Sequence, residues 1–130
     1  MGWKQFKFDI QLIDTEHRQI VHLMNNLYDK HVNQASTEDV GSALTQLYNF
    51  TVRHFEDEEK YFDSINFPEA DLHKMIHKQM LSKIQEHADN FKKAGTLNQD
   101  FFNFLKLWLS SHILGIDVKY VQHAKSKKVA

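Results

Sequence analysis

Four stretches of this chain repeat apolar residues at the spacing of an α-helix, and this pattern constrains the fold more than any other feature. The expected helices run from after Asp14 to about Asn33, from residues 36–39 to Phe62, from Pro68 to Gly95, and from Asn98 to Ile116. Aspartate, serine and asparagine suit the start of a helix, proline its first turn, and glycine its end. Because the connections are only a few residues long, neighbouring helices should run antiparallel. The sequence therefore predicts an all-α fold, an up-down-up-down four-helix bundle.

The first 13 residues do not share this helical spacing. Apolar and polar residues alternate there, and the apolar set comprises Phe6, Phe8, Ile10 and Leu12. A period of two is typical of extended chain, and an isolated strand would have no partner. We therefore expect residues 1–13 to form an extended arm laid across the bundle, anchored by Trp3, Phe6 and Phe8. At the other end of the chain, we expect the basic tail from His123 to fray.

Length and composition exclude several classes of protein. A chain of 130 residues is expected to form a single domain over 1–130. Sixteen basic against seventeen acidic side chains leave no basic excess for nucleic acid. The absence of cysteine excludes disulfides, thiolate metal sites and a cysteine nucleophile. No apolar run approaches the ~18–20 residues of a membrane span, and the first residues lack the apolar core of a signal peptide. We therefore expect a cytoplasmic protein.

Nine histidines are the unusual feature of the composition. Five of them lie on the apolar stripes, near the start of the first and third helices and near the end of the second and fourth. In an antiparallel bundle these four positions are at the same end. The sequence therefore predicts that five imidazoles converge inside the bundle: His17, His54, His73, His77 and His112.

Two carboxylates are expected to join these histidines. Glu58 follows His54 by four residues and so shares its helical face, although Asp57, three residues from His54, is nearly in phase as well. Asp117 follows the last of the five histidines by five residues, an awkward spacing for an α-helix. It can face the same point only if the helix bends or loosens near Gly115.

The remaining four histidines are not expected to join this cluster. His31 and His87 lie on apolar stripes toward the other end of the bundle, and we expect them to be core residues. His22 lies off the stripe and His123 in the tail.

Burying the five converging histidines and two carboxylates without partners would cost several kcal/mol per group, a conflict that bound metal removes. Imidazole with carboxylate suits iron, zinc, copper, nickel or manganese, and seven ligands are too many for one ion.

Four short motifs in this pattern resemble those of the hemerythrin family, and together they extend over essentially the whole chain. They are DTEH at 14–17, HFEDE at 54–58, HKMIH at 73–77 and HILGID at 112–117. The early arm with Trp3 is similar to that of the bacterial branch, the bacteriohemerythrins. All the ligand positions of the family are filled with the expected residue types.

The resemblance implies a non-haem centre of two iron ions with an oxo or hydroxo bridge, which binds dioxygen reversibly. By the same resemblance His73, His77 and His112 hold one iron, His17 and His54 hold the other, and Glu58 and Asp117 bridge the pair. The implied role is oxygen storage, delivery or sensing rather than catalysis. The alternative is a di-iron enzyme acting on peroxide, oxygen or nitric oxide. The sequence identifies no protein partner.

An apolar pocket is expected beside the metal centre. Its expected residues are Ile20, one turn from His17; Phe55, next to His54; Leu109, one turn before His112; and Trp108 behind them. The stripes offer no serine, cysteine or lysine as a nucleophile or proton source. A dry pocket of this kind would keep protons away from the bound ligand and so retard its loss as hydrogen peroxide.

Overall fold

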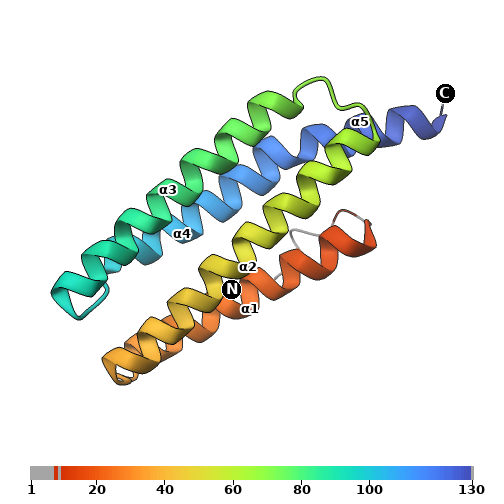
Figure 1. Ribbon diagram of the computed structural model, residues 1–130. Helices are drawn as coiled ribbons and strands as arrows, with labels where there is room; N and C mark the ends of the chain where they lie inside the picture. Colours follow the sequence, from red (N-terminus) through yellow and green to blue (C-terminus); the bar gives the residue numbers. More distant parts are fainter. Residues whose placement is uncertain (1–7, 9, 130) are drawn as a thin grey trace.

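Four long helices dominate the computed structural model of the chain, which describes residue 8 and residues 10–129 (Figure 1). The elements are α1 (Gln11–Val32), α2 (Thr37–Ser64), α3 (Ala70–Ala94), α4 (Gln99–Ser111), the π-helix η2 (His112–Asp117) and α5 (Val118–Val129). No strand occurs within this described part of the chain. The last three elements follow one another without a loop and form one long rod.

Successive helices run in opposite directions, with their connections at alternating ends of the molecule (Figure 1). This arrangement confirms the predicted helical bundle. Two connections, between α1 and α2 and between α3 and α4, lie at one end, which we call the far end. The connection between α2 and α3 lies at the other, next to α5.

Helix boundaries follow the capping signals in the sequence. The Ser36 hydroxyl accepts a hydrogen bond from the Asp39 backbone N–H at 3.1 Å, and the Asn98 side chain accepts one from Phe101 at 3.0 Å. Gly95 ends α3 with φ at 78°, in the left-handed region that glycine tolerates. One boundary differs slightly, because Pro68 lies in the turn before α3 rather than in its first helical turn.

The expected arm over residues 1–13 is wrong at its C-terminal end, because α1 already begins at Gln11. Asp14 is therefore inside the helix, and its carboxylate accepts a hydrogen bond from the Phe8 backbone N–H at 2.6 Å. The helix extends this far because Ile13 becomes a core residue, 1% exposed. Phe8 does lie against the bundle, with its ring on His17 and Tyr120. The other two proposed anchors, Trp3 and Phe6, fall outside the described residues.

The prediction of a frayed tail is also wrong, because α5 continues helical through Val129. Tyr120, Val121 and Ala124 are buried, and Tyr120 and Val121 form a small core with Phe62 and Phe67. These contacts give the start of α5 a packed face, and burial of that face stabilises the helix.

The π-helix η2 provides the loosening that the spacing of His112 and Asp117 requires. A π-helix has a wider turn than an α-helix, with hydrogen bonds from i to i+5. Two residues five apart therefore lie on the same side of it. Both His112 and Asp117 are buried, at 2% and 0% exposed, although Gly115 between them faces open space.

The larger core fills the bundle between the end with the α2–α3 connection and the far end. It joins residues of α1, α2 and α4 such as Ile20, Leu47 and Leu109. It contains most apolar residues of the predicted first, second and fourth stripes, but Phe91 is its one member from the third, and Tyr28 of the first is 39% exposed. Of the helices described, none is both long enough and apolar enough to pass through a bilayer.

Candidate metal centre

The buried polar side chains of the protein gather at the end of the bundle opposite the far end. Helix α1 contributes His17 near its start, α3 contributes His73 and His77 in its first turns, and α2 contributes His54 and Glu58 from its second half. The π-helix contributes the last two, His112 and Asp117. All seven are at most 2% exposed.

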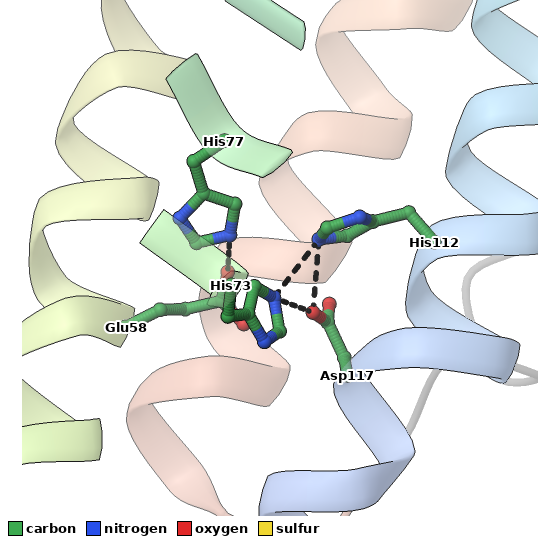
Figure 2. Close-up of side chains that lie close together, drawn as sticks. All are labelled: Glu58, His73, His77, His112 and Asp117. Carbon is green, nitrogen blue, oxygen red and sulfur yellow. Dashed lines mark hydrogen bonds and ion pairs between the residues drawn. The ribbon is translucent and has the colours of Figure 1, made fainter. Parts of the chain in front are cut away.

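These seven residues fall into two groups that share one member. The first group comprises Glu58, His73, His77, His112 and Asp117, and the second comprises His17, His54 and Glu58. Within each group, one ligand atom per residue lies within 4.8 Å of every other. Figure 2 shows the first group, with its side chains pointing toward one another from α2, α3 and η2. Asp57, the alternative to Glu58, is in neither group.

Each carboxylate contacts histidines of both groups. Glu58 Oε1 lies 3.2 Å from His54 Nε2 and 3.4 Å from His77 Nε2. Asp117 Oδ1 lies 2.8 Å from His73 Nε2 and 3.0 Å from His112 Nε2 (Figure 2). Its second oxygen, Oδ2, lies 3.9 Å from Nε2 of His17. The carboxylates therefore stand between the two sets of imidazoles.

The donor atoms at this site fit a bound cation better than they fit one another. Although Asp117 is close to two imidazole nitrogens, neither of its oxygens has a hydrogen bond of acceptable geometry. Glu58 Oε1 and His77 Nε2 also lack one, and His73 Nε2 faces another imidazole nitrogen, that of His112, at 3.2 Å. Buried polar atoms are normally hydrogen-bonded, so a cluster of unsatisfied ones needs an explanation. Lone pairs that converge on a common point are what a metal ion requires, and the residues present fit one.

Without metal, His54 would hold a proton. Burial acts to lower the pKa of His54, but the nearby Glu58 and Glu16 carboxylates outweigh it and raise that pKa to about 10. Burial acts to raise the pKa of Glu58, yet the neighbouring His54 holds it well below its usual value. The pKa of Asp117 is also lowered, against the effects of burial and of the Glu58 charge, by the neighbouring His112 and His73 imidazoles. The carboxylates are therefore ionised and ready to bind a cation.

Two hydrogen bonds and one longer contact to residues outside the predicted set surround these side chains. Glu16 Oε1 lies 2.8 Å from His54 Nδ1, and the Tyr120 hydroxyl donates to Glu58 Oε2 at 2.6 Å. Glu59 Oε2 lies 3.5 Å from Nδ1 of His77. Such contacts orient histidine and carboxylate ligands. None of these three is among the predicted ligands; the signals available in the sequence are that Glu16 directly precedes a predicted ligand and that Glu59 directly follows one.

The four predicted pocket residues are all buried, and two of them touch predicted ligands. The Phe55 ring stacks on His77, with centroids 3.8 Å apart, and Trp108 stacks on His112 at 5.4 Å. Ile20 and Leu109 are 1% and 0% exposed. Ile113, a residue outside the predicted pocket, is also buried, at 1% exposed, and follows His112 directly.

The other four histidines lie outside the cluster. His31 packs on Phe102, and His87 packs on Phe101 and Phe104. His22 is exposed, and His123 Nε2 lies 3.0 Å from a backbone carbonyl oxygen. None of the four belongs to a ligand group within the described residues.

Comparison with known proteins points to one family. The family model described as the hemerythrin HHE cation binding domain matches residues 9–124. A bacteriohemerythrin of Stenotrophomonas maltophilia (strain R551-3) is 29% identical over 119 residues, which cover 90% of this chain and 76% of the relative. A hemerythrin-like protein of Naegleria gruberi is 33% identical over 108 residues, 83% of this chain and 79% of the relative. A crystal structure of wild-type hemerythrin has a TM-score of 0.85 at 25% identity, covering 94% of this chain and 95% of that one.

Proposed function

The chain belongs to the hemerythrin family, and from this membership and the donor set at its metal centre we propose that it binds dioxygen reversibly at two non-haem iron ions. The bound irons would supply the electrons that dioxygen accepts when it binds and returns when it leaves. Storage, delivery and sensing are the roles that suit such binding. We also propose that the protein is cytoplasmic and that residues 1–130 form one domain.

The observation that carries this proposal is the position of the two carboxylates. Glu58 and Asp117 each contact histidines of both groups, as bridging ligands between two ions would. We assign His73, His77 and His112 to one iron and His17 and His54 to the other. Five neutral imidazoles with only two carboxylates leave a less electron-rich site than the carboxylate-rich di-iron sites of other helix bundles. That balance favours binding over cleavage of oxygen.

The side chains around the ligands keep the site dry and fixed. Phe55 and Trp108 cover the outer faces of His77 and His112. We assign Ile20 and Leu109, both fully buried, to the wall of the oxygen pocket, where they exclude water. Glu16 and Tyr120 hold His54 and Glu58 in orientation from the other side.

Two measurements on the purified protein test the proposal. Elemental analysis should find two irons per chain. The visible spectrum of the reduced protein should gain a band under oxygen and lose it under vacuum. One metal per chain, or zinc in the site, would contradict the two-iron assignment. Steady consumption of peroxide, oxygen or nitric oxide without a reversible band would favour the enzyme alternative.

A matched pair of histidine variants on α3 tests the assignment of the ligands. His77→Ala removes a proposed ligand and should abolish normal iron loading. His87→Ala removes a histidine ten residues along the same helix and should leave the band in place, because His87 packs on Phe101 and Phe104 and belongs to neither ligand group of the described residues. Loss of the band in the second variant alone would overturn the assignment.

A further inference from the structure

Tyr120 is a buried phenol in direct contact with a proposed metal ligand. Its side chain is 0% exposed, and its hydroxyl donates a hydrogen bond to Glu58 Oε2 at 2.6 Å. The bond is short for two oxygen atoms, as expected when the acceptor is a carboxylate. Dioxygen binding as proposed above requires only that Tyr120 hold Glu58, which leaves the redox chemistry of the phenol unused.

Of the rings that contact Tyr120 in the described part of the chain, one is a second phenol. Tyr61 on α2 lies with its ring centroid 5.8 Å from that of Tyr120. The other rings in contact belong to Phe8, Phe62, Phe67 and His73. Phenylalanine and imidazole are far harder to oxidise than phenol. Tyr61 is half-buried, so part of its side chain reaches solvent.

We propose that Tyr61 and Tyr120 form a relay that carries single electrons from the molecular surface to the metal centre. Through this relay the protein would reduce hydrogen peroxide with electrons from a small one-electron donor in solution, such as ascorbate. The path has three members in contact: a solvent-facing phenol, a buried phenol and a carboxylate of the metal centre. The proposal rests on the proposed function only in requiring a redox-active metal there.

The electrons and protons of the relay balance as follows. Reduction of one hydrogen peroxide to two waters consumes two electrons and two protons. For each electron, Tyr120 is oxidised by the centre and passes its phenolic proton to Glu58 Oε2. Tyr61 then reduces Tyr120, which recovers its proton from Glu58, while the proton of Tyr61 passes to water. A donor in solution re-reduces Tyr61, which takes a proton back from water. Two such cycles supply the two electrons for one peroxide, and the two protons that it consumes come from the solvent.

Trp108 is the competing electron donor near the centre. Its indole stacks on His112, with centroids 5.4 Å apart, and is as easily oxidised as a phenol. However, the indole Nε1 has no hydrogen-bond partner among the described residues, so no base stands ready to accept its proton. Tyr120 has such a base in Glu58. This difference favours Tyr120 as the first residue to be oxidised.

Electron paramagnetic resonance tests the relay on the iron-loaded ferric protein. The protein is mixed with hydrogen peroxide, frozen and examined for a radical, with and without ring-deuterated tyrosine. We expect a tyrosyl signal that narrows on deuteration. Tyr120→Phe should lose the signal. Tyr61→Phe should retain a radical on Tyr120 but lose the ascorbate-driven consumption of peroxide.

Controls separate the relay from general damage and from failure of the metal site. Tyr48→Phe changes a tyrosine of α2 outside the relay and should match wild type in signal and turnover. Iron content and the oxygen-dependent band are measured for every variant. If Tyr120→Phe fails to load iron, Tyr61→Phe decides the test, because Tyr61 is not in the ligand cluster.

Three results would overturn the relay. The first is a radical signal that does not narrow on tyrosine deuteration and disappears in Trp108→Phe. The second is the absence of any radical in protein with two irons and a normal oxygen band. The third is equal peroxide turnover in wild type and Tyr61→Phe. Each leaves dioxygen binding intact. Failure of wild type to load a redox-active metal would instead overturn both proposals.

Discussion

At the candidate metal centre, single side chains make contacts through two of their polar atoms. His54 presents Nε2 to Glu58 at 3.2 Å and Nδ1 to Glu16 at 2.8 Å. Glu58 likewise offers one oxygen to the imidazoles and the other to Tyr120. Because both ends of each group are held, the donor atoms are positioned before any cation arrives, which lowers the cost of assembling the site.

Leu109 should control the lifetime of the oxygenated protein. Leu109→Ala opens space that water can enter when polar partners are present, so the oxygen-dependent band should decay to the ferric spectrum faster, and faster still at low pH. Unfolding should also become easier by about 2–5 kcal/mol, as is usual for buried leucine. Decay rates are measured below the melting temperature, with Leu105→Ala, one turn away and 2% exposed, as the control. Equal decay in wild type and Leu109→Ala would show that Leu109 is ordinary packing.

Glu16 should govern how the stability of the metal-free protein depends on pH. His54 binds a proton more tightly when folded, with a pKa of about 10 against an ordinary 6.5. Its contribution to stability is therefore complete below about pH 6.5 and is lost as the pH rises through 10. Glu16→Gln removes one of the carboxylates that raise this pKa, so melting temperature should fall less steeply over that range. The exposed Glu56→Gln is the control, and parallel curves for Glu16→Gln and wild type would contradict the assignment.

At the scale of single elements, the sequence predicted regular helices better than their irregular ends. Capping by Ser36 and Asn98 and termination at Gly95 follow from local chemistry and were predicted correctly. The start of α1 was not, because alternation over a few residues fits an arm as well as the first turn of a helix. Leu12 shows the ambiguity: it was placed on the apolar side but is 55% exposed.

Gly95 at the end of α3 and Gly115 in η2 should respond oppositely to alanine. Gly115 in η2 has nothing within 4 Å of an added Cβ, so Gly115→Ala should stabilise the protein by about 0.5–1 kcal/mol through reduced chain entropy. Gly95 has φ at 78°, where a Cβ is strained, so Gly95→Ala should destabilise it by about 1–2 kcal/mol. Urea unfolding measures both. The same sign for both variants would show that backbone conformation is not the deciding factor.

At the scale of the whole molecule, the proposed metal centre would tie all four long helices together at one end. Its proposed ligands come from α1, α2 and α3 and from η2 at the end of α4. The convergence of seven residues at this end could be predicted from helix order and spacing alone. Contacts such as those of Glu16 and Tyr120 could not, because they depend on how each helix is rotated about its axis.

Removal of iron should loosen one end of the bundle more than the other. A metal that binds only the folded state stabilises it by mass action, so the metal-free protein should melt at a lower temperature. Amide hydrogen exchange should speed up most in η2 and the start of α5, and least at the far end around Phe91, where core packing continues. Calorimetry and exchange measured by mass spectrometry check the two parts. Identical melting of both forms would refute this coupling.

The π-helix also sets the rotational phase of the chain beyond it. In an α-helix each residue turns the chain by about 100°, so one residue more or fewer redirects every side chain downstream. Asp117 faces the centre, and Tyr120 reaches Glu58, in the phase that the wide turn of η2 establishes. Deletion of one residue within His112–Asp117 would therefore rotate every later side chain about the helix axis. It would leave the composition almost unchanged while turning a ligand and a phenol away from the centre together.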